Sequence, residues 1–132
     1  MNTWAVLTAA ASSFLLGGLW YSPALFGKTW TNENGGHSEK GCDIQNGHPA
    51  KVFGVSILFS VISAFAFALW LGPAPALAVT LKAGGLAGFG MVAASFGINY
   101  QFGGRSFKLW LIDGGYHTVQ FLLFGLVLGL WH

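Results

Sequence analysis

The chain has 132 residues, of which 54% are hydrophobic and only ten are charged, six Lys or Arg and four Asp or Glu. A soluble domain of this length needs a polar shell around its core, and these side chains are too few to supply one. The net charge of +2 is too small to indicate nucleic-acid binding. We therefore expect an integral membrane protein with no nucleic-acid partner.

The charged residues are also segregated along the chain. Six of the ten lie within residues 28–51, whereas 1–27, 52–81, 83–104 and 114–132 contain no Asp, Glu, Lys or Arg. A bilayer enforces such a pattern because an unpaired charge in hydrocarbon is costly. No basic residue precedes the first apolar run, so we interpret that run as a retained helix and not as a cleaved signal peptide.

Helix-breaking residues divide the apolar sequence into four stretches, each long enough to cross a bilayer. Pro23 ends the first stretch because the residue before a proline disfavours the helical region. Pro49 precedes the second, and Gly72 followed by Pro73 closes it. We therefore predict an all-α integral membrane four-helix bundle that forms a single domain, with a polar loop at 28–50. The predicted helices cover about residues 3–22, 51–71, 76–100 and 107–131.

Basic residues predict the orientation of the four helices. Four spans place the connections 28–51 and 103–108 on one side, and both termini and the 73–82 turn on the other. The first side carries five Lys or Arg residues, and the second carries only Lys82. The excess of basic residues predicts that the first side is cytoplasmic and that both termini lie on the outer side.

Small residues recur on each predicted helix at spacings that put them on one face. In lipid, helices associate by close backbone approach, which small residues permit. We expect the helices to meet along these stripes, namely Ala5, Ala9, Ser13 and Gly17; Ser56, Ser60, Ala64 and Ala68; Gly84 and Gly88; and Gly125 and Gly129.

The strongest candidate site lies on the fourth helix, where Asp113, Tyr116, His117 and Gln120 share one face. An ionisable group within a membrane span is a functional candidate, and a carboxylate beside an imidazole can relay protons or hold a cation. A structural role is the favoured interpretation, because Asp113 lies close to the predicted end of the helix. Asp113 would then pair with the nearby basic residues Lys108 or Arg105, or join a network with Asn99 and Tyr100.

The polar loop offers a second group of potential ligands, His37, Cys42, Asp43 and His48. Imidazole and thiolate bind zinc and related metals. The spacing matches no common zinc motif, and a solvated loop is the favoured interpretation, with a metal site as the alternative. We find no catalytic or nucleotide-binding motif, and we expect no cofactor apart from bound lipid.

Two segments carry a family resemblance. Residues 18–23 read Gly-Leu-Trp-Tyr-Ser-Pro and close the first helix, while residues 111–117 read Leu-Ile-Asp-Gly-Gly-Tyr-His and open the last. With the ending Leu-Gly-Leu-Trp at 128–131, the chain resembles the bacterial membrane proteins grouped as domain of unknown function 1761. The resemblance implies a four-helix protein of the bacterial inner membrane, and it brings no established activity.

Carried over onto this chain, the resemblance picks out Trp20, Tyr21, Ser22, Pro23, Tyr116 and His117. The first four would lie at the same end of the bundle as Asp113. Our hypothesis is that Tyr21 or Ser22 forms a hydrogen bond with His117 and that Trp20 covers this cluster.

Two functions remain open from the sequence. The first is an interaction or scaffold subunit that forms a homo-oligomer or belongs to a larger membrane complex. The second is a small transporter or channel that oligomerises around Asp113 and His117, since four helices seldom enclose a pore. We do not expect an enzyme.

Overall fold

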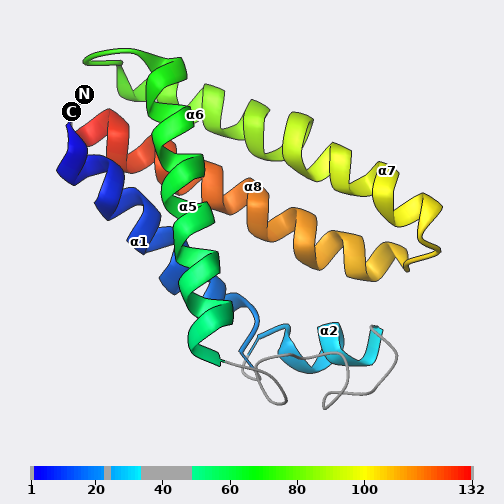
Figure 1. Ribbon diagram of the computed structural model, residues 1–132. Helices are drawn as coiled ribbons and strands as arrows, with labels where there is room; N and C mark the ends of the chain where they lie inside the picture. Colours follow the sequence, from blue (N-terminus) through cyan, green and yellow to red (C-terminus); the bar gives the residue numbers. More distant parts are fainter. Residues whose placement is uncertain (1, 23–24, 34–48, 132) are drawn as a thin grey trace.

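The computed structural model describes residues 2–22, 25–33 and 49–131, and every regular element in these ranges is helical (Figure 1). The elements are α1 (Thr3–Trp20), α2 (Gly27–Glu33), α5 (Pro49–Leu71), α6 (Leu77–Gly85), η1 (Leu86–Ala93), α7 (Ala94–Phe102) and α8 (Phe107–Leu130).

Four spans are long and apolar enough to cross a membrane, which confirms the predicted fold class. They cover Thr3–Trp20, Ala50–Leu71, Leu77–Phe102 and Phe107–Leu130, and each end lies within two residues of the predicted one. The third span is continuous because α6, η1 and α7 follow one another without a break. The prediction of a loop from residue 28 is wrong at its start, since α2 occupies Gly27–Glu33.

Side-chain caps and glycines set several helix ends. The Asn2 side chain accepts hydrogen bonds from the backbone N–H groups of Trp4 and Ala5 at 3.0 and 3.3 Å, and it thereby begins α1. Ser106 caps α8 in the same way, with Leu109 as the donor at 3.1 Å. Gly72 follows α5 with φ of 81°, a conformation that favours glycine.

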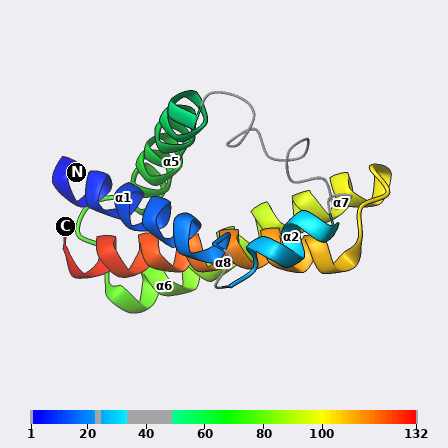
Figure 2. The same cartoon turned by 90° about the horizontal axis from the view of Figure 1, so that it is seen from below.

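Helix α8 lies at the centre of the bundle. It packs against α6, η1 and α7 on one side and against α1 on another, whereas α5 packs mainly against α1 (Figures 1 and 2). The two chain ends lie together at one end of the bundle (Figure 1).

Glycines bring the third span and α8 into backbone contact. A Cβ at Gly125 would lie 2.4 Å from the Thr80 carbonyl oxygen, and one at Gly84 would lie 2.5 Å from the Phe121 carbonyl oxygen. Gly88 is equally confined. Most of the predicted small-residue stripes therefore lie at helix contacts, but Ser56 is an exception because its side chain is exposed.

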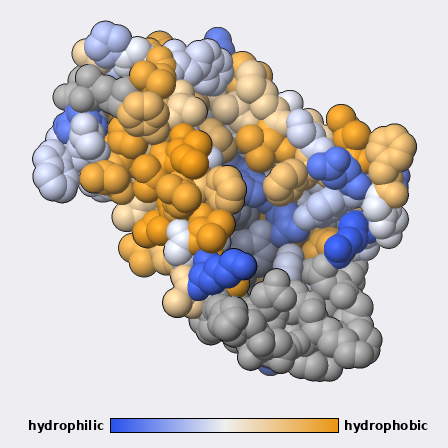
Figure 3. Space-filling view, viewed as in Figure 1, coloured by the Kyte–Doolittle hydropathy of each residue, from blue (hydrophilic) through white to orange (hydrophobic). Residues whose placement is uncertain are grey.

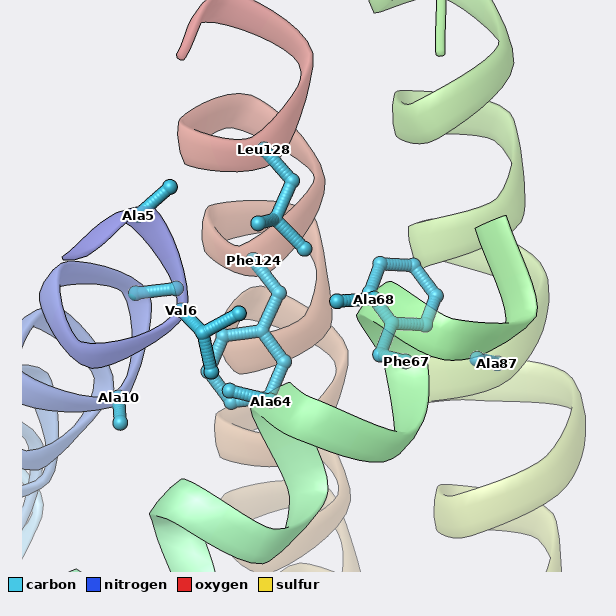
Figure 4. Close-up of a cluster of buried hydrophobic side chains, with 10 residues drawn as sticks. Ala5, Val6, Ala10, Ala64, Phe67, Ala68, Ala87, Phe124 and Leu128 are labelled. Atoms are coloured by element: carbon cyan, nitrogen blue, oxygen red, sulfur yellow. The ribbon is translucent and has the colours of Figure 1, made fainter. Parts of the chain in front are cut away.

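An apolar core fills the half of the bundle that holds the chain termini. Small residues of α1 and α5 pack there against larger ones of α8, and Phe124 is fully buried (Figure 4). Phe67 of α5 reaches α8, with its ring centroid 5.4 Å from that of Phe121. This half contains the buried cluster Ala5, Val6, Ala9, Ala10, Ala64, Phe67, Ala68, Ala87, Phe124 and Leu128.

Residues Leu86–Ala93 of the third span form a π-helix, which the sequence did not predict. Its wider turn changes the backbone hydrogen bonding, and a π-helical segment commonly exposes a carbonyl to another donor. Here the Trp110 indole Nε1 donates to the Ala93 carbonyl oxygen at 2.7 Å. This bond links the π segment to the start of α8.

Candidate functional site

Asp113 is the centre of a hydrogen-bonded network near the end of the bundle opposite the chain termini. The Tyr21 hydroxyl donates to Asp113 Oδ1 at 2.5 Å, and the Tyr100 hydroxyl donates to Oδ2. The Asp113 side chain is buried. Because Tyr21 follows α1 and Tyr100 lies on α7, the carboxyl group ties both neighbouring helices to α8.

The two tyrosine hydroxyls each satisfy one oxygen of the carboxyl group. Hydrogen bonds to an ionised acceptor are about twice as strong as neutral ones, and two of them offset part of the cost of burying a carboxylate. Burial and the adjacent Asp113 carboxylate raise the pKa of Tyr21, which lies just beyond the end of α1, well above its ordinary value. Tyr21 therefore keeps its proton and acts as a donor.

The prediction that His117 forms a hydrogen bond with Tyr21 or Ser22 is wrong. Tyr21 bonds to Asp113, and the Ser22 hydroxyl donates to the Leu19 carbonyl oxygen at 2.7 Å. The Nδ1 atom of His117 instead lies 2.7 Å from Gln120 Oε1. The positions i and i+3 on α8 explain this pairing, since they are neighbours on one helix face.

Aromatic rings join these two hydrogen-bonded groups. The ring of Tyr116 lies 5.7 Å from that of Tyr21 and 4.9 Å from that of His117. The Tyr116 hydroxyl donates to the Ser13 carbonyl oxygen of α1 at 2.9 Å. The expected cluster of Asp113, Tyr116, His117, Gln120 and Tyr21 is thus contiguous.

Trp20 lies over the start of this cluster. Its indole Nε1 donates to the Ile112 carbonyl oxygen at 2.9 Å, and its ring lies against Gly115. Asn99, in contrast, has an exposed side chain, so the alternative network with Asp113 contains Tyr100 but not Asn99. Tyr100 was one of the partners expected for Asp113 in that alternative network, and its hydroxyl donates to Oδ2.

The protonation of His117 follows from its partner. Because Gln120 Oε1 is an acceptor, Nδ1 carries the proton and Nε2 presents a lone pair. The imidazole lies edge-on to Phe96, with ring centroids 4.9 Å apart. Nε2 has no hydrogen-bond partner among the described residues, and it reaches the surface, since no buried side-chain nitrogen or oxygen there is unpaired.

A groove separates α5 from η1 on one side of the bundle. Its volume is about 350 Å³, and α8 contributes Phe121, one helical turn beyond His117. In Figure 3, hydrophilic surface is recessed beside the hydrophobic surface of α5. The groove is lined by Ile62, Ser63, Ala66, Phe67, Trp70, Ala87, Met91, Val92 and Phe121.

Within 2–22, 25–33 and 49–131, no three His, Cys, Asp or Glu side chains come together as a metal site. The loop candidates His37, Cys42, Asp43 and His48 lie outside these ranges.

Comparison with known proteins supports the resemblance drawn from the sequence. A family model described as protein of unknown function (DUF1761) matches residues 4–129. No curated protein and no solved structure matches the chain.

Proposed function

The chain belongs to the DUF1761 family, and from this premise we propose that it is a membrane-embedded interaction subunit that associates with a second copy of itself. The observation that carries the proposal is the open side of the bundle, the groove between α5 and η1. In this view the protein acts through assembly and not through catalysis.

The open side lies within the spans, where lipid or another helix must fill it. Helix α5 packs mainly on α1 and stands apart from α7 (Figures 1 and 2). The same face therefore carries both a projecting helix and a groove. Two copies related by a twofold axis can each place α5 in the groove of the other, because such an interface is self-complementary. This complementarity favours a second copy over lipid.

A transport function has less support from the geometry. Both Asp113 oxygens accept hydrogen bonds from tyrosines, which favours a structural role. Beyond Gln120, the described interior of α8 continues with Phe124 and Leu128, which are apolar and buried. The polar cluster thus occupies one part of the protomer and does not extend along its whole length.

We place the protein in the bacterial inner membrane, with the end that holds Lys28, Lys51, Arg105 and Lys108 in the cytoplasm. Exposed basic side chains favour that side, and of the Lys and Arg residues that the structure describes, only Lys82 lies near the opposite end. Both termini would then lie on the outer side, and bound lipid would cover the remaining apolar surface.

A bulky side chain in the groove tests the proposed association. Ala66 lines the groove on α5, so Ala66→Trp should block the second copy. Ala11 is also exposed but lies on α1, and Ala11→Trp is the matched control. We would measure dimerisation in lipid bilayers by energy transfer between labelled copies. We expect wild type and Ala11→Trp to dimerise and Ala66→Trp to raise the dimer Kd at least tenfold. A wild-type chain that stays monomeric would overturn the proposal.

A further inference from the structure

His117 presents a hydrogen-bond acceptor, Nε2, that no residue within 2–22, 25–33 and 49–131 engages. Its Nδ1 is engaged by Gln120, while Nε2 has no bond to any residue in the described parts of the chain. A membrane span offers little water to form the missing hydrogen bond. The unpaired lone pair of Nε2 therefore favours a ligand or a neighbouring protein that brings a hydrogen-bond donor.

Ser56 presents the complementary group on α5. Of the three serines on this helix, Ser60 is buried, Ser63 is half-buried and lines the groove, and Ser56 is exposed. Within the described residues, the Ser56 hydroxyl has no hydrogen-bond partner.

Some Ser and Thr hydroxyls of the transmembrane helices bond within their own helix. Ser13 donates to the Ala10 carbonyl oxygen at 3.0 Å, and Thr118 donates to the Gly114 carbonyl oxygen at 2.8 Å. Ser56, in contrast, is an exposed donor on α5, the helix that stands apart from α7.

We propose that Ser56 of each copy donates a hydrogen bond to His117 Nε2 of the other copy. The inference rests on the proposed homo-oligomer and names the polar contact within it. Hydroxyl and imidazole side chains commonly join transmembrane helices in this way. A twofold axis makes the contact reciprocal, so each dimer gains two equivalent bonds.

Depth in the membrane is compatible with this pairing. Ser56 lies seven residues beyond Pro49, the first residue of α5, and His117 lies ten residues beyond Phe107, the first of α8. At 1.5 Å per residue the two lie about 10 and 15 Å from the ends of their helices, a difference of about one turn. Both helices begin at the basic end, so both groups lie in the halves of their helices that are nearer to that end.

A double-mutant cycle on dimerisation tests the contact. We would compare wild type, Ser56→Ala, His117→Ala and the double variant in bilayers, with Ser95→Ala as a control for an exposed serine on α7. Two bonds of the strength usual between membrane helices predict that each single variant raises the dimer Kd about tenfold. The dimer Kd of the double variant should be no higher than that of the weaker-binding single variant. The dimer Kd of Ser95→Ala should match that of wild type.

The outcomes separate this inference from the proposed function. The contact is refuted if the wild-type chain dimerises but Ser56→Ala leaves the dimer Kd unchanged. It is also refuted if the losses of dimerisation free energy in the two single variants add in the double variant. In both cases the proposed homo-oligomer is retained. A monomeric wild type that binds lipid refutes both. If His117→Ala does not fold, His117→Gln and Ser56→Ala still test the contact. Ser56 is exposed, and the side-chain carbonyl of a glutamine can replace the imidazole as the hydrogen-bond acceptor.

Discussion

Gly125→Ala is the substitution for which the structure predicts the clearest effect on stability. The added Cβ would lie 2.4 Å from the Thr80 carbonyl oxygen and 2.9 Å from its carbonyl carbon, whereas ordinary contact begins at 3.4 Å. Helix α6 would have to retreat from α8 by about 1 Å, because the neighbouring atoms are backbone and have no rotamer to change.

The size of the effect follows from the balance of two terms. Alanine in place of glycine stabilises a helix interior by about 0.5–1 kcal/mol. Overpacking of a close contact costs about 1–3 kcal/mol. Gly129 packs equally close to Thr80, so the displacement would also loosen the next turn. We expect a net loss of about 1–2 kcal/mol in the free energy of unfolding.

Reversible unfolding in mixed micelles, followed by tryptophan fluorescence and far-UV circular dichroism, would measure this loss. Gly54→Ala is the matched control, because a Cβ at Gly54 on α5 meets nothing within 4 Å. It should leave stability unchanged or raise it slightly. If Gly125→Ala proved as stable as Gly54→Ala, close packing of α6 on α8 would not hold the bundle together.

Three further predictions concern the polar end and the orientation. Asp113→Asn should lower the free energy of unfolding by about 1–3 kcal/mol, because an amide offers one acceptor oxygen where Tyr21 and Tyr100 need two, and chemical unfolding would measure it. Trp110→Phe removes the bond to the π segment and should cost about 1 kcal/mol in the same assay, while leaving dimerisation unchanged. A membrane-impermeant thiol reagent should label Cys42, the single cysteine, in inverted vesicles but not in intact cells.

The four spans could be predicted because the bilayer imposes a pattern that local sequence records. Charges cluster outside the spans, and Gly72 and Pro73 interrupt the apolar sequence where α5 ends. The short helix α2 was not predicted, since Gly27–Glu33 has neither a long apolar run nor a helical repeat of apolar residues. The π-helix was also missed, because Leu86–Ala93 reads as ordinary apolar helix and carries no local signal for a wider turn.

The candidate site was predictable within α8 and less so between helices. Helical periodicity alone places Asp113, His117 and Gln120 on one side. Which donor reaches Asp113 depends on how α1 and α7 approach α8, and this approach is set by distant contacts such as those of the glycines. The sequence therefore identified the residues of the cluster but assigned Tyr21 to the wrong acceptor.

The packing also implies that folding and association can be disturbed independently. Close glycine contacts and the Asp113 network hold α1, α7 and α8 together, whereas α5 packs mainly on α1. Gly125→Ala alters a buried contact between α8 and α6, so it should lower stability more than it lowers the affinity between copies at equal folded fraction. Ser56→Ala alters an exposed hydroxyl and should do the reverse. If both variants changed both quantities in proportion, the open side would be part of the folding core, and assembly through α5 would lose its structural basis.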